Sequence, residues 1–553
     1  MTPAKRFFSL LRLDKKDVSQ IFFYAIFAGL ISLSLPLGIQ AIVNFLQSGR
    51  ASVSWIILVI GVVTGVAFVG ILSLMQLRIT ENIQQKIFVR ASFEFAYRLP
   101  KIKFEELYHD LYPPEIANRF FDTLTIQKGV AKLLLDYSSA LLQIVFGIIL
   151  LSLYHSSFIL FGLLLLLLLY FIFKFSYTKG IDTSMYESKY KYRAADWLQE
   201  IARNKSSFRK ALNFDYALQK NNTLTNNYTD YREKHFNIIK RQYGQLILFK
   251  VLITAGLLLT GGYLVLNQQM NIGQFVAAEI IILLVINSVE KIVLGLETFY
   301  DVLTAVEKIG KVTDMKMEEV VETDSKTLSD QITIETAHLY FRFPNSEKDT
   351  LKDISLKIEQ GEKVILNGEN GSGKTTLLRT LSGILKPSQG SLFINDNTFR
   401  KMEINQYRSQ IGMIIHGESP FEGSILENIT FNNPELTQQD IHWALDAVQL
   451  SSYIRTLPEG LDTKLFPEGK QLSSSNAQKI LLARSIISRP AVLIYEDPTD
   501  KMDPDTAAAI IDFICSARHN WTIIVSSANP GWKQNSSRSI TMENGVIIND
   551  TKK

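Results

Sequence analysis

Six long apolar segments occupy the N-terminal half of this 553-residue chain, and they constrain its fold more than any other feature of the sequence. A helix needs about 20 predominantly apolar residues to cross the hydrocarbon layer of a bilayer. The chain is also 47% hydrophobic, which agrees with apolar surface that faces lipid instead of water. We therefore predict an all-α transmembrane domain of six helices. The predicted spans lie at about 21–45, 53–77, 131–154, 158–173, 245–266 and 272–296.

The first segment has the basic front of a signal peptide, but it is too long to be one. A signal peptide has an apolar core of about 7 to 15 residues that ends at a small-residue cleavage site. We expect this segment to stay in the protein as its first membrane helix. The basic residues in front of it are Lys5, Arg6, Arg12, Lys15 and Lys16.

The connections between the segments predict how the chain is oriented. The three short connections hold only Arg50 as a basic residue, whereas the two long ones, 78–129 and 174–243, are rich in Lys and Arg. Basic connections stay in the cytoplasm, so both termini are predicted to be cytoplasmic. The long connections also have the pattern of amphipathic helices. We expect the membrane helices to continue through them beyond the bilayer, in preference to separate soluble inserts.

Three single residues stand out. Pro36 falls inside the first span and predicts a kink, which serves either helix packing, the interpretation we favour, or a substrate path. Glu279 falls inside the sixth span, where a carboxylate is costly unless it faces protein or water, so it is either a pathway residue or a partner in an interhelical hydrogen bond. Cys515 is the single cysteine, which excludes an intrachain disulfide and favours a buried thiol.

The character of the sequence changes after Gly310, where a polar and charged stretch follows the last apolar segment. From Ile332 onward, apolar strands, glycine-rich turns and helices alternate, which predicts an α/β nucleotide-binding domain. We place the transmembrane domain at 1–315, a linker at 316–330 and the α/β domain at 331–553. The net charge of +4 is too small for this length to indicate a nucleic-acid partner, and none is expected.

The second half contains a complete phosphate-binding loop. The residues from Gly368 to Thr375 fit G-x-x-x-x-G-K-[ST], with an apolar strand before them and a helical pattern after them. Glycines let successive backbone N–H groups point at phosphate oxygens, and the helix N-terminus adds a favourable dipole. Lys374 is predicted to reach the β and γ phosphates of ATP, and the Thr375 hydroxyl to bind Mg²⁺. The predicted ATP-binding residues of this loop are Gly368, Asn370, Gly371, Ser372, Gly373, Lys374, Thr375 and Thr376.

With six spans in front of this loop, the chain resembles an ABC exporter half-transporter over almost its whole length. The stretches 34–45 and 261–279 look like the membrane domains of bacterial type I secretion and bacteriocin-export transporters. Some of those transporters carry an N-terminal cysteine peptidase domain, which is not expected here because no cysteine precedes the spans. The resemblance also implies two cytoplasmic coupling helices, at about 111–118 and 204–209, that dock on nucleotide-binding domains.

The resemblance implies further ATP-binding positions, some of which are altered. Phe343 matches the aromatic residue, usually Tyr, that stacks on adenine. Ser473 is retained from the signature Leu-Ser-Gly-Gly-Gln, but both glycines are replaced, by Ser474 and Ser475. Asp503 matches the D-loop aspartate. Loss of the glycines is expected to hinder the approach of this backbone to the γ phosphate of a nucleotide held by the opposite subunit.

The catalytic positions implied by the resemblance are altered as well. His416 stands in place of the Q-loop glutamine, and Ser527 in place of the switch histidine. Glu496 and Asp497 reverse the usual Asp-Glu order. Glu496 is expected at the metal with Thr375 and His416, whereas Asp497 is one methylene shorter than the glutamate that polarises the attacking water. A misplacement of about 1 Å can cost on the order of a hundredfold in rate, so we expect weak or absent hydrolysis at this chain's own site.

Exporters of this kind work in pairs, with each nucleotide between the phosphate loop of one subunit and the signature of the other. A homodimer would carry every altered residue twice, so we favour a heterodimer in which this chain is the degenerate member. The alternative is a regulatory or structural membrane subunit that binds ATP without useful hydrolysis. A soluble ATPase with a membrane anchor would have one or two spans, and six count against it.

The expected location is the inner (plasma) membrane, with the ATP-binding domain cytoplasmic and a peptide or protein as the exported substrate.

Overall fold

The structure is a computed structural model that describes residues 1–47, 53–107, 113–210, 215–318, 331–399 and 404–553. Two compact units make up the chain: Met1–Ile102 with Leu111–Lys316, and Lys103–Asp110 with Met317–Lys553. Most of the linker predicted at 316–330 and the start of the coupling helix predicted at 111–118 lie outside the described residues.

The first unit is helical. Its α-helices are α1 (Pro3–Leu13), α2 (Lys15–Ser32), α3 (Ser34–Gln47), α4 (Val53–Arg98), α6 (Pro113–Asn118), α7 (Asp122–Tyr154), α8 (Ile159–Arg203), α9 (Lys205–Arg209), α10 (Tyr216–Leu266) and α11 (Ile272–Thr313). Short 3-10 helices are η1 (Leu99–Lys101), η2 (Arg119–Phe121) and η3 (Ser156–Phe158). The short helices α6 and α9 occupy the positions predicted for coupling helices.

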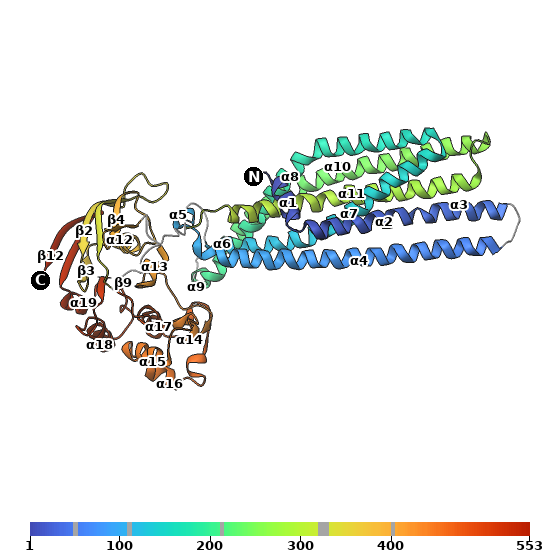
Figure 1. The fold of residues 1–553 in the computed structure, drawn as a ribbon. Coiled ribbons are helices and arrows are strands. Elements are labelled where there is room, and N and C mark those ends of the chain that lie inside the picture. Colours follow the sequence, from blue (N-terminus) through green and yellow to red (C-terminus); the bar gives the residue numbers. More distant parts are fainter. Residues whose placement is uncertain (48–52, 108–112, 211–214, 319–330, 400–403) are drawn as a thin grey trace. The chain divides into compact units, whose positions relative to one another are not determined.

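Within the described residues, 6 stretches of helix are long and apolar enough to cross a membrane, which confirms the predicted number. They are Lys15–Gln47, Val53–Lys101, Glu115–Tyr154, Ser156–Arg203, Tyr216–Leu266 and Ile272–Thr313. Helices α8 and α10 have 45 and 51 residues, about twice what a bilayer requires. Helices of this length agree with membrane helices that continue beyond the bilayer, which stays a prediction. Figure 1 shows the long helices of this unit side by side.

The kink predicted at Pro36 is a break between two helices. Helix α2 ends at Ser32, and the N–H of Leu33 turns back to the carbonyls of Ile31 and Leu30. Pro36 is buried in the first turn of α3. It has no N–H to donate to the carbonyl of Ser32, four residues earlier, so a continuous helix would lose a hydrogen bond there. A proline is tolerated in the first turn of a new helix, which is where the break places it.

Glycines on α7 and α11 let a side chain of one helix pack directly against the backbone of the other. A β-carbon on Gly147 of α7 would lie 2.6 Å from Cγ2 of Val285 on α11. In the opposite direction, a β-carbon on Gly295 of α11 would lie 2.6 Å from the ring of Tyr137 on α7. Both distances are below ordinary van der Waals contact, so only glycine fits at these two positions. Small residues of this kind let membrane helices approach closely.

Glu279 is exposed on α11 within the chain. No hydrogen bond joins its carboxylate to another residue in the described part of the chain. Among the described residues, the interhelical hydrogen bond considered for Glu279 therefore does not form, and its role in a pathway stays a prediction.

The second unit combines helices with β-sheets. Its α-helices are α5 (Phe104–Leu107), α12 (Lys374–Leu381), α13 (Ile404–Ser409), α14 (Ile425–Thr430), α15 (Gln438–Ala447), α16 (Ser451–Thr456), α17 (Ser474–Ile486), α18 (Pro504–Ile514) and α19 (Pro530–Asn535). Its strands are β1 (Ile334–Phe341), β2 (Leu351–Ile358), β3 (Lys363–Asn367), β4 (Gln389–Ile394), β5 (Asn397–Thr398), β6 (Ile411–Ile414), β7 (Gly423–Ser424), β8 (Lys464–Leu465), β9 (Val492–Glu496), β10 (Thr522–Ser526), β11 (Arg538–Glu543) and β12 (Val546–Lys552). The described residues of this unit also include the 3-10 helices η5 (Gly460–Asp462) and η6 (Pro467–Gly469).

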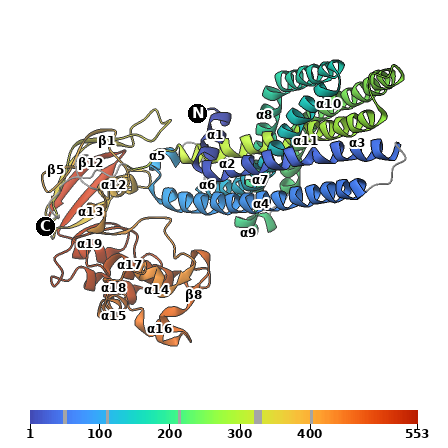
Figure 2. The same ribbon diagram turned by 45° about the vertical axis from the view of Figure 1, so that its right-hand side comes forward.

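The main sheet has 6 strands in the order β12-β11-β3-β10-β9-β6. Strands β11, β3, β10, β9 and β6 are parallel, and β12 is an antiparallel edge strand. A second, antiparallel sheet has the order β2-β1-β4-β5. Figure 2 shows helices α14 to α18 gathered on one side of the strands. The α/β architecture predicted for the C-terminal part is confirmed.

Both faces of the main sheet are buried, as parallel strands require. In β3, Val364 and Leu366 belong to the hydrophobic cluster that includes α12, whereas Ile365 between them belongs to the opposite cluster with α17 and α18. The sequence of β3 is therefore continuously apolar instead of alternating. Cys515, at the end of α18, lies in the second of these clusters as a free thiol, and burial raises its pKa to about 11. This confirms the predicted buried cysteine.

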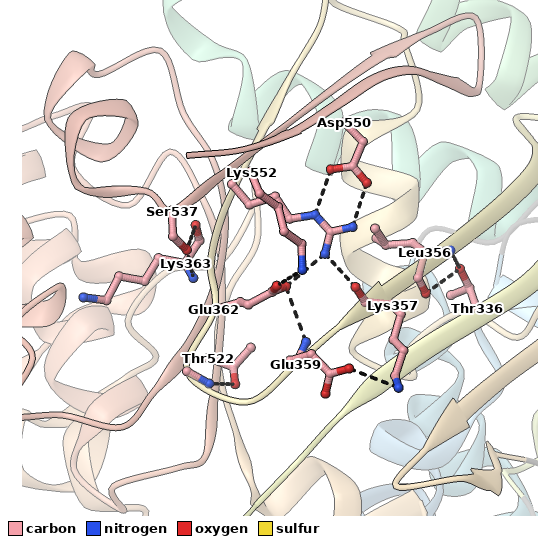
Figure 3. Close-up of polar contacts among 12 residues, drawn as sticks. Thr336, Leu356, Lys357, Glu359, Glu362, Lys363, Thr522, Ser537, Asp550 and Lys552 are labelled. Atoms are coloured by element: carbon pink, nitrogen blue, oxygen red, sulfur yellow. Dashed lines mark hydrogen bonds and ion pairs between the residues drawn. The ribbon is translucent and has the colours of Figure 1, made fainter.

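A buried arginine ties the edge strand β12 to the rest of the sheet. Figure 3 shows the residues around it, with Asp550 and Lys552 of β12 near Glu362 and Lys357. Arg538 on β11 is 6% exposed, and its guanidinium donates to both carboxylate oxygens of Asp550 on β12, at 2.8 and 2.6 Å. It also donates to Oε2 of Glu362 at 2.9 Å and to the carbonyl of Lys357 at 2.6 Å. Lys552 donates to the other oxygen of Glu362 at 2.5 Å. Two carboxylates and one carbonyl thus satisfy the charge and the donors of a buried cation.

The substitution Arg538→Ala is expected to loosen β12, because Asp550 and Glu362 lose the cation between them. Truncating one partner of a fully buried ion pair costs about 3 to 5 kcal/mol. These carboxylates are partly exposed, so we expect about 2 kcal/mol and roughly thirtyfold faster amide exchange in β12. Hydrogen–deuterium exchange of the full chain, read by mass spectrometry, measures this.

The matched control is Arg342→Ala, which removes a more exposed ion pair, with Asp349, from the same unit. Surface pairs contribute about 0 to 1 kcal/mol, so exchange in β12 should not change. Equal exchange rates in both variants would contradict the role assigned to Arg538.

The pH dependence of this contact follows from the pKa of Asp550, which lies below its usual value because Arg538 donates hydrogen bonds to the carboxyl. A pKa lowered in the folded state adds stability above the unfolded-state pKa, near about 4, and this stability is lost as the pH falls. The difference in unfolding temperature between wild type and Asp550→Asn should therefore be constant above about pH 5 and shrink below about pH 4. A difference that stays the same across this range would show that Asp550 is not the titrating group.

Candidate nucleotide-binding site

The phosphate loop joins β3 to α12 through three glycines with positive φ. The angles are +142° at Gly368, +85° at Gly371 and +101° at Gly373. Side chains disfavour these values, so the loop conformation depends on glycine. At Gly368 space is also limiting, because a β-carbon would lie 2.3 Å from the carbonyl oxygen of Met542. The loop conformation thus agrees with backbone N–H groups that surround phosphate oxygens, and phosphate binding by its residues stays a prediction.

The Lys374 amine is held over this loop by backbone carbonyls. Its Nζ donates to the carbonyl of Gly368 at 2.7 Å and to that of Glu369 at 2.9 Å. Lys374 is also the first residue of α12, so its charge lies at the helix N-terminus beside the loop. A cation and a helix N-terminus in one place favour a polyanionic ligand.

The carboxylate of Glu496 contacts the other two residues predicted to hold the metal, Thr375 and His416. The Thr375 hydroxyl donates to Oε1 of Glu496, and the backbone N–H of His416 donates to Oε2 at 3.0 Å. A hydroxyl and a carboxylate beside a phosphate loop are the hard oxygen donors that Mg²⁺ takes together with phosphate oxygens. The residues present therefore fit a magnesium ion carried by a nucleoside triphosphate.

Asp497 has a fixed backbone and an exposed side chain. Its φ is +45°, its N–H donates to the carbonyl of Ser526 at 2.8 Å, and its own carbonyl accepts from the Gln478 side chain at 2.8 Å. Both backbone groups of Asp497 are thus engaged, which restricts movement of this segment.

Gln478 is a site residue that the sequence analysis did not identify. It is buried in α17, and its Nε2 also donates to Asp500 at 2.5 Å while its Oε1 accepts from the N–H of Lys501. One amide thus fixes the segment that follows β9. Gln478 lies two residues after the signature. Nothing near it in the sequence indicates its role, because its partners are about 20 residues further along the chain.

Ser527 directly follows β10. Its Oγ accepts the N–H of Asn529 at 3.2 Å, so the hydroxyl stabilises a local turn. A serine in this turn offers a short neutral side chain where the family resemblance implies an imidazole.

Ser473 and Asp503 are not brought to the phosphate loop within this chain. Ser473 precedes α17, and its Oγ accepts the N–H of Asn476 at 3.2 Å. Asp503 precedes α18, and its carboxylate accepts the N–H of Thr506 at 2.9 Å, which lowers the pKa of Asp503. Both residues are helix N-caps. Their predicted contacts with ATP belong to a second subunit and stay predictions.

The remaining predicted ATP contacts lie around the loop. Phe343, just after β1, packs edge-on against Phe341 with the ring centroids 4.9 Å apart. Asn370 is exposed on the loop, whereas Ser372 and Thr376 are 4% and 7% exposed and support it from inside. The stacking of Phe343 on adenine stays a prediction.

Comparison with known proteins relates this site to a family. Residues 351–500 match the ABC transporter family. The chain is 28% identical over 320 residues to the uncharacterized ABC transporter ATP-binding protein YfiB of Bacillus subtilis (strain 168), a match that covers 57% of this chain and 54% of that protein. It is also 28% identical over 311 residues to the alpha-hemolysin translocation ATP-binding protein HlyB of Escherichia coli O157:H7, covering 55% of this chain and 43% of that protein. The chain thus spans about half the length of these curated relatives.

Among solved structures, the fold is similar to that of a bacterial Atm1-family ABC exporter with ATP bound. The TM-score is 0.85 at 16% identity, and the match covers 97% of this chain and 95% of that one. The likeness shows a shared fold that extends over the helical unit and the α/β unit.

The phosphate loop offers a test of its glycines. Gly368→Ala places a β-carbon against a backbone carbonyl, whereas Gly371→Ala meets no atom within 4 Å and suffers only from its positive φ. We expect Gly371→Ala to cost about 1 kcal/mol and Gly368→Ala roughly 3 kcal/mol, since overpacking adds to the backbone strain. The melting temperature of the α/β unit in the full chain measures the difference. Equal losses in the two variants would mean that the contact with Met542 does not constrain the loop.

Proposed function

We propose that this chain, whose residues 351–500 belong to the ABC transporter family, is one half of an exporter that binds ATP with Mg²⁺ and moves a substrate out of the cytoplasm as a dimer. The contact between Thr375 and Glu496 carries the proposal, because it joins a phosphate loop to the carboxylate proposed to hold the metal. The described residues also include six helices long and apolar enough to cross a membrane. The chain is a multi-pass protein of the inner (plasma) membrane with its ABC domain in the cytoplasm. In this proposal the short helices α6 and α9 are the coupling helices.

In this proposal, different residues of the chain bind different parts of the nucleotide. The backbone N–H groups of the loop and the Lys374 amine bind the phosphates, and Phe343 stacks on the adenine. Thr375 and Glu496 hold the metal, which when bound neutralises charge on the phosphates. Ser473 and Asp503, which lie at helix N-termini, face the nucleotide of the second subunit.

The proposed cargo is a peptide or protein. One relative, HlyB, is named for the translocation of alpha-hemolysin, and this supports a polypeptide substrate. Glu279 is the proposed pathway residue, because it is an exposed carboxylate within an apolar membrane helix.

The chain is proposed to be the degenerate member of a heterodimer. Asp497 is too short and its backbone is held in place, and Ser527 lacks an imidazole. Ser474 and Ser475 lie in the first turn of α17, where the family signature has glycines. Since these changes affect both nucleotide sites of a homodimer, an intact partner is needed for ordinary turnover. An ATP-binding regulatory subunit without hydrolysis is the second candidate, and the loss of the switch histidine favours it.

Asp497→Glu tests the proposal directly. The longer side chain recovers about 1 Å of reach, and we expect ATP turnover by the purified chain in lipid nanodiscs to rise roughly ten- to a hundredfold. Wild-type chain is expected to bind ATP with Mg²⁺ and to release phosphate slowly.

Lys374→Ala, alone and combined with Asp497→Glu, is the control, and both variants should lose ATP binding and turnover. Ordinary transporter turnover by wild-type chain alone would remove the preference for a heterodimer. Slow turnover that Asp497→Glu leaves unchanged would favour the regulatory subunit.

A further inference from the structure

Helix α13 holds the C-terminal end of α12. The Tyr407 hydroxyl donates to the carbonyl of Leu381, the last residue of α12, at 2.6 Å. Arg408 donates to the carbonyl of Gly383 at 2.7 Å. Tyr407 is fully buried, and Gly383 has a φ of +73° with the ring of Phe399 directly against it. The helix that begins at the phosphate loop is therefore fixed at its other end, about 12 Å along its axis.

Arg408 also binds the segment that follows α11 in the chain. Its two terminal guanidinium nitrogens donate to the two carboxylate oxygens of Glu318, at 2.5 and 2.9 Å. Glu318 comes shortly after Thr313, where α11 ends, and it belongs to the second unit. The two side chains are 29% and 21% exposed, and a bidentate pair fixes orientation as well as distance. One arginine thus joins this segment to the end of α12.

A second segment attaches to the same helix. Residues Lys103–Asp110 follow α4 in the chain but belong to the second unit. Phe104 packs against the hydrophobic cluster that contains Leu377 and Leu381 of α12, and the guanidinium of Arg379 lies 5.8 Å from the centroid of its ring. Two segments that are far apart in the sequence, and that both continue from helices of the first unit, therefore contact α12 or the residues that hold it.

The ion pair shortens the connection between α11 and the second unit. An extended chain from Thr313 to Glu318 spans at most about 17 Å. Among the described residues, the next buried position along the chain is Ile332, and an extended chain from Thr313 to Ile332 could span about 65 Å. With the pair formed, a displacement of α12 reaches α11 through a few residues, and little slack is left to absorb it.

We propose that the ion pair between Glu318 and Arg408 is a latch that transmits occupancy of the phosphate loop along α12 to α11. Energetic coupling of this kind is carried by rigid secondary elements and the polar contacts between them. The latch acts within one chain and is separate from the short helices α6 and α9. The inference rests on the proposed function, because the signal is ATP bound at the phosphate loop.

The test uses full-length chain in nanodiscs with Cys515→Ala and two spin labels at exposed positions, Lys311→Cys near the end of α11 and Asn405→Cys on α13. Labelled chain is mixed with excess unlabelled chain, so that only distances within one chain are measured. Double electron–electron resonance should give a narrow distance distribution, with a mean that shifts when ATP and Mg²⁺ are added. Glu318→Gln should at least double the width of the distribution and remove the shift, because the charge that holds Arg408 is lost.

Two further variants test whether one contact is responsible. Arg408→Gln, alone or with Glu318→Gln, should give the same result as Glu318→Gln, since the same pair is lost each time. Arg342→Gln, which removes the pair with Asp349 in the same unit, is the matched control and should keep the narrow distribution and the shift.

ATP binding is measured on the same samples. If the labelled parent binds ATP but shows no shift, or if Glu318→Gln keeps the narrow distribution and the shift, the latch is wrong while the proposed function stands. Absence of ATP binding by the parent would overturn the proposed function and the latch together.

Discussion

The parallel alignment of β3, β10, β9 and β6 is the constraint on which the candidate site depends. Each of these strands ends at the same edge of the sheet, and each leads into one part of the site. The phosphate loop follows β3, Ser527 follows β10, Glu496 ends β9 and His416 follows β6. Ligands of open α/β sheets bind outside the carboxyl ends of the strands for this reason. The contact between Thr375 and Glu496 is formed across β10, so the register of two strand pairs has to be correct before it can form.

Local patterns in the sequence predicted much of this structure. The apolar segments predicted the number of membrane helices, and the spacing of Gly368, Gly373, Lys374 and Thr375 predicted the phosphate loop. Each apolar segment and the loop motif lie within 25 consecutive residues, so their signals are local. Contacts between distant residues had no such signal. The sequence did not predict that the amide of Gln478 fixes the segment after β9, nor that 103–110 would group with the second unit. Such features depend on which strands and helices become neighbours, and that is decided by packing.

The residues at which the chain departs from the family pattern fit their local structure. Ser473 caps α17, Ser527 stabilises a turn, and the backbone of Asp497 is engaged at both its N–H and its carbonyl. Each position is therefore structurally satisfied with the residue it has. The domain packs with these residues in place, so its fold does not depend on other side chains at these positions. His416 follows the same rule, since its contact with Glu496 is made by the backbone.

The glycines between α7 and α11 limit how the membrane unit can rearrange. At Gly147 and Gly295 a neighbouring side chain lies directly on the helix backbone, and a small separation would leave a gap that neither lipid nor water can fill. Dispersion forces fall off steeply with distance, so the two helices resist coming apart even slightly. Whenever the helical unit changes shape, α7 and α11 would therefore move together as one rigid pair. Any separation between helices must then occur along some other pair.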